Sequence, residues 1–166
     1  MELGTSPRPE YISGGCECRS IRYKISFPEG SKWPPNSNHC HCSQCRKTLG
    51  GLFATLLHIP VADFIHESTS TLKVYQSSEY GRRGFCTHCG GGIYFFETDE
   101  PDGPIFCVAA GSVDSEYLNG ELLAGLKRDL YSIMAVRGVD DVVGRGLERH
   151  VAGSKSEILD QFVGDD

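Results

Sequence analysis

The chain has 166 residues, 39% of them hydrophobic and 23% charged, which is enough for a hydrophobic core and ordinary for a globular protein. Its formal net charge of −6 argues against a nucleic-acid partner, because such proteins present a basic face. The sequence has no apolar window of about 18 residues and no apolar signal segment in residues 1–10, so we expect no membrane span and a cytoplasmic location.

Short apolar runs separated by turn residues predict a mainly β fold with a few short helices. Residues 1–10 are expected to form a flexible N-terminal arm, and residues 11–166 a single domain. A loop is predicted at 28–38, which contains two consecutive prolines. Strands are predicted at 20–27, 53–59, 72–75, 93–96, 105–109 and 129–136, and short helices at 115–125 and 154–162.

Eight cysteines are the most informative feature of the sequence. In the reducing compartment expected here, closely spaced cysteines indicate metal ligands or catalytic thiols rather than a disulfide scaffold, which stays as the alternative. Cys16 and Cys18 form a C-x-C pair, whose sulfurs reach the same side if the pair lies on an extended strand. Cys86 and Cys89 form a C-x2-C pair followed by a glycine. Together they offer four thiolates, a complete tetrahedral shell that predicts a structural zinc site.

The segment from Cys40 to Cys45 overlaps a C-x-C with a C-x2-C spacing. Cys40, Cys42 and Cys45 offer three thiolates, which leaves a fourth position open to water or substrate, the pattern of a catalytic zinc. The side chain of His41 is expected to point away from the sulfurs, whereas His39 is expected to approach the metal or its surroundings. The alternatives are a second structural site completed by one of these histidines and a redox-active thiol cluster.

The remaining cysteine, Cys107, lies in the apolar segment 105–109 and is expected to be a buried, inert side chain. The other histidines, among them His58 and His88, are expected to be ordinary core or surface residues.

These motifs resemble the glutathione-dependent formaldehyde-activating (GFA) enzymes, a family also named for centromere protein V. The ordered set of three cysteine motifs is specific, and a fourth block is weaker. The four segments are Gly15-Cys16-Glu17-Cys18, Cys40-His41-Cys42-Ser43-Gln44-Cys45-Arg46-Lys47 leading to Gly50-Gly51-Leu52-Phe53, Phe85-Cys86-Thr87-His88-Cys89-Gly90, and Ala110-Gly111-Ser112-Val113-Asp114. The resemblance implies a zinc-pinned β-tent of bent antiparallel sheets, shared with methionine sulfoxide reductase B.

The resemblance also implies two zinc ions per chain, one structural and one catalytic, with the ligands assigned above. The family's founding activity joins formaldehyde to glutathione as S-hydroxymethylglutathione and is classed as that of a carbon–sulfur lyase. The chain departs from the family pattern at 126–133, where Tyr131 stands near the place of a family histidine. If this region lines the pocket, the substrates are expected to differ from that pair.

The working hypothesis is a zinc-dependent carbon–sulfur lyase that activates a small thiol, such as glutathione, or a carbonyl at the three-cysteine site. Because glutathione carries carboxylates, local cations are needed to bind it. The substrate-binding candidates are Arg46, Lys47, Arg82, Arg83 and His39. The alternatives are a non-catalytic, zinc-stabilised module that binds a protein, and a thiol redox enzyme in which Cys107 reacts.

Overall fold

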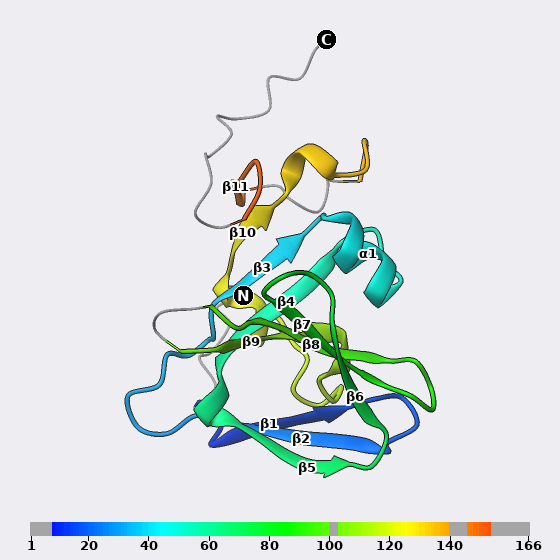
Figure 1. Cartoon of the computed structure of the whole chain (residues 1–166). Helices are drawn as coiled ribbons and strands as arrows, with labels where there is room; N and C mark the ends of the chain where they lie inside the picture. Colours follow the sequence, from blue (N-terminus) through cyan, green and yellow to red (C-terminus); the bar gives the residue numbers. More distant parts are fainter. Residues whose placement is uncertain (1–7, 100–102, 140–145, 154–166) are drawn as a thin grey trace.

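A computed structural model describes residues 8–99, 103–139 and 146–153, which form two β-sheets (Figure 1). The small sheet has the strand order β1-β2-β5 and is antiparallel throughout. Its strands are β1 (Tyr11–Gly15), β2 (Ile21–Ser26) and β5 (Phe64–Thr69).

The large sheet has the order β11-β10-β3-β4-β9-β8-β7-β6. Its neighbours are antiparallel, except that β10 is parallel to both β3 and β11. Its strands are β3 (Ser37–Cys40), β4 (Ala54–Pro60), β6 (Leu72–Gln76), β7 (Gly81–Cys86), β8 (Gly92–Glu97), β9 (Ile105–Ala109), β10 (Leu126–Leu130) and β11 (Glu148–Arg149). The prediction of a mainly β fold is confirmed, with mixed rather than purely antiparallel pairing.

The helices are short, as predicted. Helix α1 (Ser43–Leu49) begins where the Cys42 side chain accepts a hydrogen bond from the Cys45 amide and ends at Gly50, which adopts the left-handed conformation with φ of 69°. The remaining turns are 3₁₀ helices: η1 (Val61–Asp63), η2 (Ala110–Ser112), η3 (Leu122–Gly125) and η4 (Ser132–Met134).

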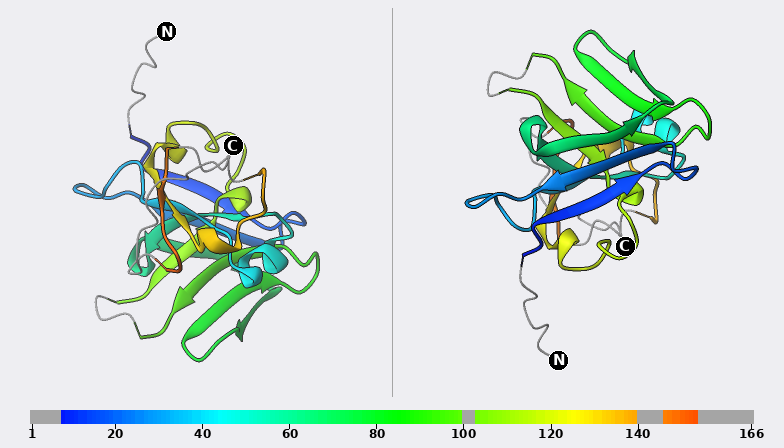
Figure 2. Two further views of the ribbon diagram at one scale, coloured as in Figure 1. Left: turned by 90° about the horizontal axis from the view of Figure 1, so that it is seen from above. Right: turned by 90° about the horizontal axis from the view of Figure 1, so that it is seen from below.

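A hydrophobic core lies between the two sheets. Seen from below in Figure 2, the strands β1 and β2 pass in front of the large sheet. Strand β2 alternates buried and half-buried residues, so that Ile21, Tyr23 and Ile25 enter the core while the residues between them face outward. The ring of Tyr23 lies 4.7 Å from that of Phe64, and its hydroxyl is 2.8 Å from the Ser112 hydroxyl. This contact connects η2, which directly follows β9 of the large sheet, to β2 of the small sheet.

A charged contact strengthens the same connection. The guanidinium of Arg22 on β2 donates two hydrogen bonds to the carboxylate of Asp114, at 2.9 and 2.5 Å. The hydroxyl of Ser13 on β1 donates a third, at 2.5 Å. Arg22 therefore holds the pKa of Asp114 below its ordinary value. Asp114 is the last residue of the weaker sequence motif, 110–114. Its structural role is to connect the segment after η2 to β1 and β2.

Several predicted elements differ from the structure. The sequence missed β1, β3, β5, β7, β11 and α1. Strand β3 lies at the end of the predicted loop, and its four residues are all buried, so they show no alternation. The helix expected at 115–125 is only the 3₁₀ turn η3. The strand expected at 129–136 is β10, which begins at Leu126 and ends at Leu130. The predicted helix at 154–162 and most of the predicted arm lie outside the described residues.

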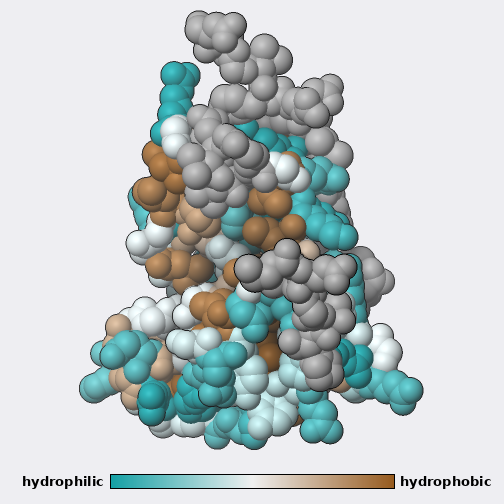
Figure 3. Space-filling view, turned by 180° about the vertical axis from the view of Figure 1, so that it is seen from behind, coloured by the Kyte–Doolittle hydropathy of each residue, from teal (hydrophilic) through white to brown (hydrophobic). Residues whose placement is uncertain are grey.

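Helices long and apolar enough to cross a membrane are absent from the described part of the chain. On the face shown in Figure 3, apolar side chains gather in the middle and upper parts of the molecule, while the lower part is mainly hydrophilic. The lower part in this orientation contains the small sheet.

Candidate metal centres and active site

Four sulfurs meet where the β1–β2 turn approaches the turn after β7. The sulfurs of Cys16, Cys18, Cys86 and Cys89 all lie within 4.8 Å of one another. The Cys16–Cys18 and Cys18–Cys86 sulfur distances are 3.5 and 3.7 Å. A tetrahedral zinc with sulfur ligands at about 2.3 Å separates those ligands by about 3.8 Å. The four thiols therefore fit a closed zinc site, which we call the four-cysteine site.

The local backbone of this site differs from the expectation for Cys16 and Cys18. They lie in a turn rather than on an extended strand, and Arg19 adopts a positive φ of 62° to close it. The Ile21 amide donates to the Cys16 sulfur at 3.3 Å. Burial acts to raise the pKa of the Cys86 thiol, but hydrogen bonds from Thr71 and from backbone amides outweigh it and lower the pKa to about 6. Local donors thus favour a thiolate at Cys86.

The second group joins the end of β3 to the start of α1. Cys40 ends β3, Cys42 caps α1, and Cys45 lies inside this helix, so their sulfurs also fall within 4.8 Å of one another. We call this group the three-cysteine site. Cys40 and Cys45 are buried, whereas Cys42 is half-buried. Within the described residues, neither a histidine nor a carboxylate belongs to this group. The donor set fits zinc with three protein ligands.

The histidines beside this site face away from it. In β3 successive side chains alternate between the faces of the sheet, so His39 and Cys40 point in opposite directions. The ring of His39 packs 4.6 Å from that of Phe53. The Nε2 atom of His41 lies 2.5 Å from a carboxylate oxygen of Asp129. The expected orientation of His41 is therefore observed. His39, expected near the metal or its surroundings, lies behind the site with its Nδ1 atom 3.9 Å from Asp129.

The three thiols of this site influence one another strongly. The pKa of Cys42 is lowered to about 2, first by hydrogen bonds with Cys40 and Cys45 and further by the charge of Arg83. Hydrogen bonds with Cys42 and Cys45, together with burial, raise the pKa of Cys40. One thiol of the group therefore ionises readily, and its negative charge opposes the ionisation of a second thiol. A cation at this position is what allows all three to ionise.

Arg83 on β7 supplies a permanent cation to this site. Its side chain is 5% exposed, and its Nη2 atom lies 3.5 Å from the Cys45 sulfur and 3.4 Å from the Gln44 side-chain oxygen. The guanidinium also lies 4.7 Å from the centre of the Phe95 ring. The sequence predicts Arg83 as a substrate-binding residue, and the structure places it directly against a cysteine of the site.

The other predicted cations are Arg82 on β7 and two residues of α1. Arg82 donates to the backbone oxygens of Glu79 and Gly81. Arg46 and Lys47 lie in the last turn of α1, where Arg46 is half-buried and Lys47 is exposed. These two side chains follow the third cysteine directly and flank the site.

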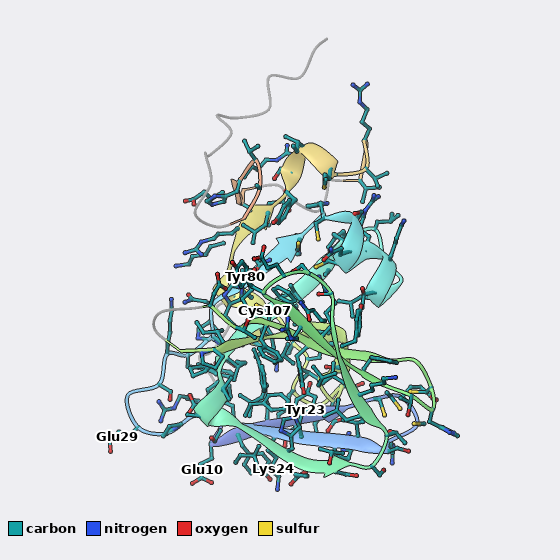
Figure 4. The ribbon with its side chains drawn as sticks, viewed as in Figure 1. Glu10, Tyr23, Lys24, Glu29, Tyr80 and Cys107 are labelled. Atoms are coloured by element: carbon teal, nitrogen blue, oxygen red, sulfur yellow. The ribbon has the colours of Figure 1, made fainter. Side chains whose placement is uncertain are left out.

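A small pocket lies beside the three-cysteine site, between α1 and strands β4, β7, β8 and β9. Cys107 on β9 is half-buried, lines this pocket together with Arg83, and packs against the three-cysteine cluster. Figure 4 shows it within the large sheet, away from peripheral residues such as Glu29. The expectation of a fully buried Cys107 is therefore wrong. The pocket lining comprises Thr48, Leu49, Leu56, Arg83, Gly84, Gly92, Ile93, Tyr94, Phe95, Cys107 and Ala109.

The segment after β10 covers another side of the three-cysteine site. Tyr131 packs against its cluster and adopts a left-handed conformation with φ of 56°, which is unusual for a bulky residue. The sequence singles out Tyr131 as a departure from the family pattern. The contact of the nearby Asp129 with His41 has no signal in the sequence. Such strained residues often occur at functional sites.

The fold and the two sulfur groups define a mainly β protein suited to binding two metal ions, one in a closed and one in an open shell. The model of the family "Glutathione-dependent formaldehyde-activating enzyme" matches residues 11–123. The chain belongs to this family.

Two curated relatives bear related names. A "putative glutathione-dependent formaldehyde-activating enzyme" of Halomonas elongata is 27% identical over 63% of this chain and 67% of its own. An "uncharacterized lyase" of Schizosaccharomyces pombe is 32% identical over 55% of this chain and 61% of its own, so the match leaves more than a third of that relative uncovered. A solved structure of a Rhodobacter sphaeroides protein is 20% identical, covers 63% of this chain and 89% of its own, and has a TM-score of 0.49.

Proposed function

We propose that the chain is a zinc-dependent lyase-type enzyme that makes or breaks a carbon–sulfur bond at the three-cysteine site. The observation that carries this proposal is the convergence of Cys40, Cys42 and Cys45 beside Arg83, with no further histidine or acidic ligand among the described residues. The names of the curated relatives support the same class of reaction. The four-cysteine site is proposed to hold a second, structural zinc.

Zinc bound by three thiolates would lower the pKa of a thiol substrate and polarise a carbonyl. Three thiolates and one divalent cation leave a net charge of about −1, which opposes an incoming thiolate. Arg83 offsets this charge from within 3.5 Å of the Cys45 sulfur. Its burial among Phe95 and other apolar groups keeps water from screening this attraction.

The substrates proposed are a small thiol of the glutathione type and a small carbonyl such as formaldehyde. Arg46 and Lys47 are proposed to hold substrate carboxylates, because they follow Cys45 on α1 and reach solvent. Arg82 and His39 remain further candidates. Arg82 also donates to backbone oxygens, and His39 lies on the face of the sheet opposite Cys40. The predicted cytoplasmic location remains a prediction.

A second candidate function is supported by Cys107, which lines the pocket beside the site. A thiol redox enzyme needs a reactive cysteine outside the metal shells, and this half-buried residue has the necessary position. Under the lyase proposal Cys107 is dispensable, whereas under the redox alternative it is essential. The two functions are therefore separated by one substitution.

The test is the formation of S-hydroxymethylglutathione from glutathione and formaldehyde by the zinc-loaded protein, followed by proton NMR. The wild type and Cys107→Ser are expected to accelerate the reaction equally, while Cys42→Ser is expected to lose the acceleration. A wild type that holds zinc at both sites and accelerates neither this reaction nor the addition of other small thiols to aldehydes would refute the proposal. Thiol–disulfide exchange by the wild type that is lost in Cys107→Ser, in place of this addition, would favour the redox enzyme.

A further inference from the structure

Asp129 on β10 is fully buried behind the three-cysteine site, on the face of the sheet opposite the sulfurs. Its exposed fraction is 0%, and its carboxylate lies 2.5 Å from His41 Nε2. The hydroxyl of Ser132 lies 3.3 Å from the same carboxylate, and Arg149 Nε lies 3.6 Å from it. His39 Nδ1 is more distant, at 3.9 Å. His41 therefore has the shortest of these contacts with Asp129.

His41 is the residue that spaces Cys40 from Cys42. Its backbone amide donates to the Leu130 carbonyl at 2.9 Å, so both its main chain and its side chain are held by β10. Strand β10 pairs with β3 just before this point, with Leu130 opposite Cys40 and Asp129 opposite His39. The middle of the C-x-C segment is consequently fixed at two points, one on the backbone and one on the imidazole ring.

We infer that Asp129 is a positioning residue for the three-cysteine site. By holding the His41 ring on one side of the backbone, it fixes the direction in which the flanking Cys40 and Cys42 side chains leave on the other side. Groups that orient metal ligands from outside the shell typically change metal affinity by about 10–100-fold. The inference rests on the proposed metal-binding role of this site, and it does not depend on which reaction the metal supports.

The inference extends the site beyond the part of the chain that the family model covers. The match ends at residue 123, whereas Asp129 and Leu130 follow it. A buried carboxylate is costly unless it is well paired, and the contacts of Asp129 meet this requirement at the back of the cysteine segment. The proposed open metal site is thus assembled from the cysteine motif and from a strand that lies outside the residues matched by the family model.

The experiment measures zinc affinity at both sites of the full chain by competition with a chromogenic chelator. Asp129→Ala is expected to weaken zinc binding at the three-cysteine site by about 10–100-fold and to leave the four-cysteine site unchanged. Asp129→Asn retains an oxygen that accepts a hydrogen bond from His41, so it is expected to restore most of the affinity. Ser132→Ala is the matched control, because it removes a different partner of the same carboxylate.

A second variant guards against misfolding of Asp129→Ala. His41→Asn removes the imidazole contact from the other side and is expected to weaken the same site alone. Combined with Asp129→Ala, it should add little further loss, since the two side chains act as one pair. Unchanged affinity at the three-cysteine site in a folded variant, or equal weakening of both sites, overturns the inference. A wild type that binds two zinc ions but lacks lyase activity would refute the proposed function and leave this result standing.

Discussion

The two cysteine groups should differ sharply in their contribution to stability, because they close loops of different lengths. The four-cysteine site joins Cys18 to Cys86, which are 68 residues apart. A cross-link over about 68 residues removes about 4 kcal/mol of chain entropy from the unfolded state, expressed as free energy at room temperature. Cys40 and Cys45 are only five residues apart, and the same relation gives about 2 kcal/mol for their loop.

We therefore expect the double substitution of Cys86 and Cys89 by serine to lower the free energy of unfolding more than the matching substitution of Cys40 and Cys42. The difference should be about 2 kcal/mol, measured by urea denaturation of zinc-saturated proteins and followed by circular dichroism. Metal analysis should find one zinc per chain in each variant. Equal destabilisation, or a larger loss from the second pair, would contradict the division into structural and catalytic sites.

The remaining predictions concern three ionisable side chains. Arg83→Met should weaken zinc binding at the three-cysteine site by at least about 10-fold in chelator competition. The reason is that a unit charge 3.5 Å from the Cys45 sulfur interacts with it by about 5 kcal/mol at an effective dielectric constant of about 20, before desolvation is subtracted. Arg83→Lys should restore part of this affinity, and equal affinity in the wild type and both variants would be evidence against a role for the charge. Asp114→Ala should lower stability by about 1 kcal/mol and reduce the melting temperature, since it releases Arg22 and Ser13 at a partly exposed position. Burial, reinforced by Arg128, lowers the pKa of His58 from 6.5 to about 4. The unfolded state therefore binds a proton first on acidification, and stability should fall between about pH 6.5 and 4 by at most about 3 kcal/mol. His58→Gln should show a shallower decline, and an unchanged slope in denaturation midpoints would disprove this assignment.

The local cysteine spacings correctly predicted which sulfurs meet within each motif, and the need for four thiolates correctly paired the first motif with the third. In Cys42 and Cys45 the spacing matches one turn of α1, and in Cys86 and Cys89 it matches a tight turn that Gly90 completes with a positive φ of 79°. The assigned metal roles remain predictions. Strand prediction was less complete, because buried β3 and the polar β7 lack the alternation by which a half-buried strand is recognised.

The sequence by itself determined the mainly β class, the family and the three cysteine motifs, because closely spaced residues reach one another through the local geometry of a turn or helix. The meeting of Cys18 with Cys86, which are 68 residues apart, follows from the fold rather than from local spacing. Only the tertiary structure decided what surrounds those sulfurs. Arg83 meets Cys45 across 38 residues, and Asp129 meets His41 across 88. Such contacts depend on the order of strands in the sheet, where β10 lies beside β3, and hydrogen bonding between distant strands leaves no periodic mark on either segment.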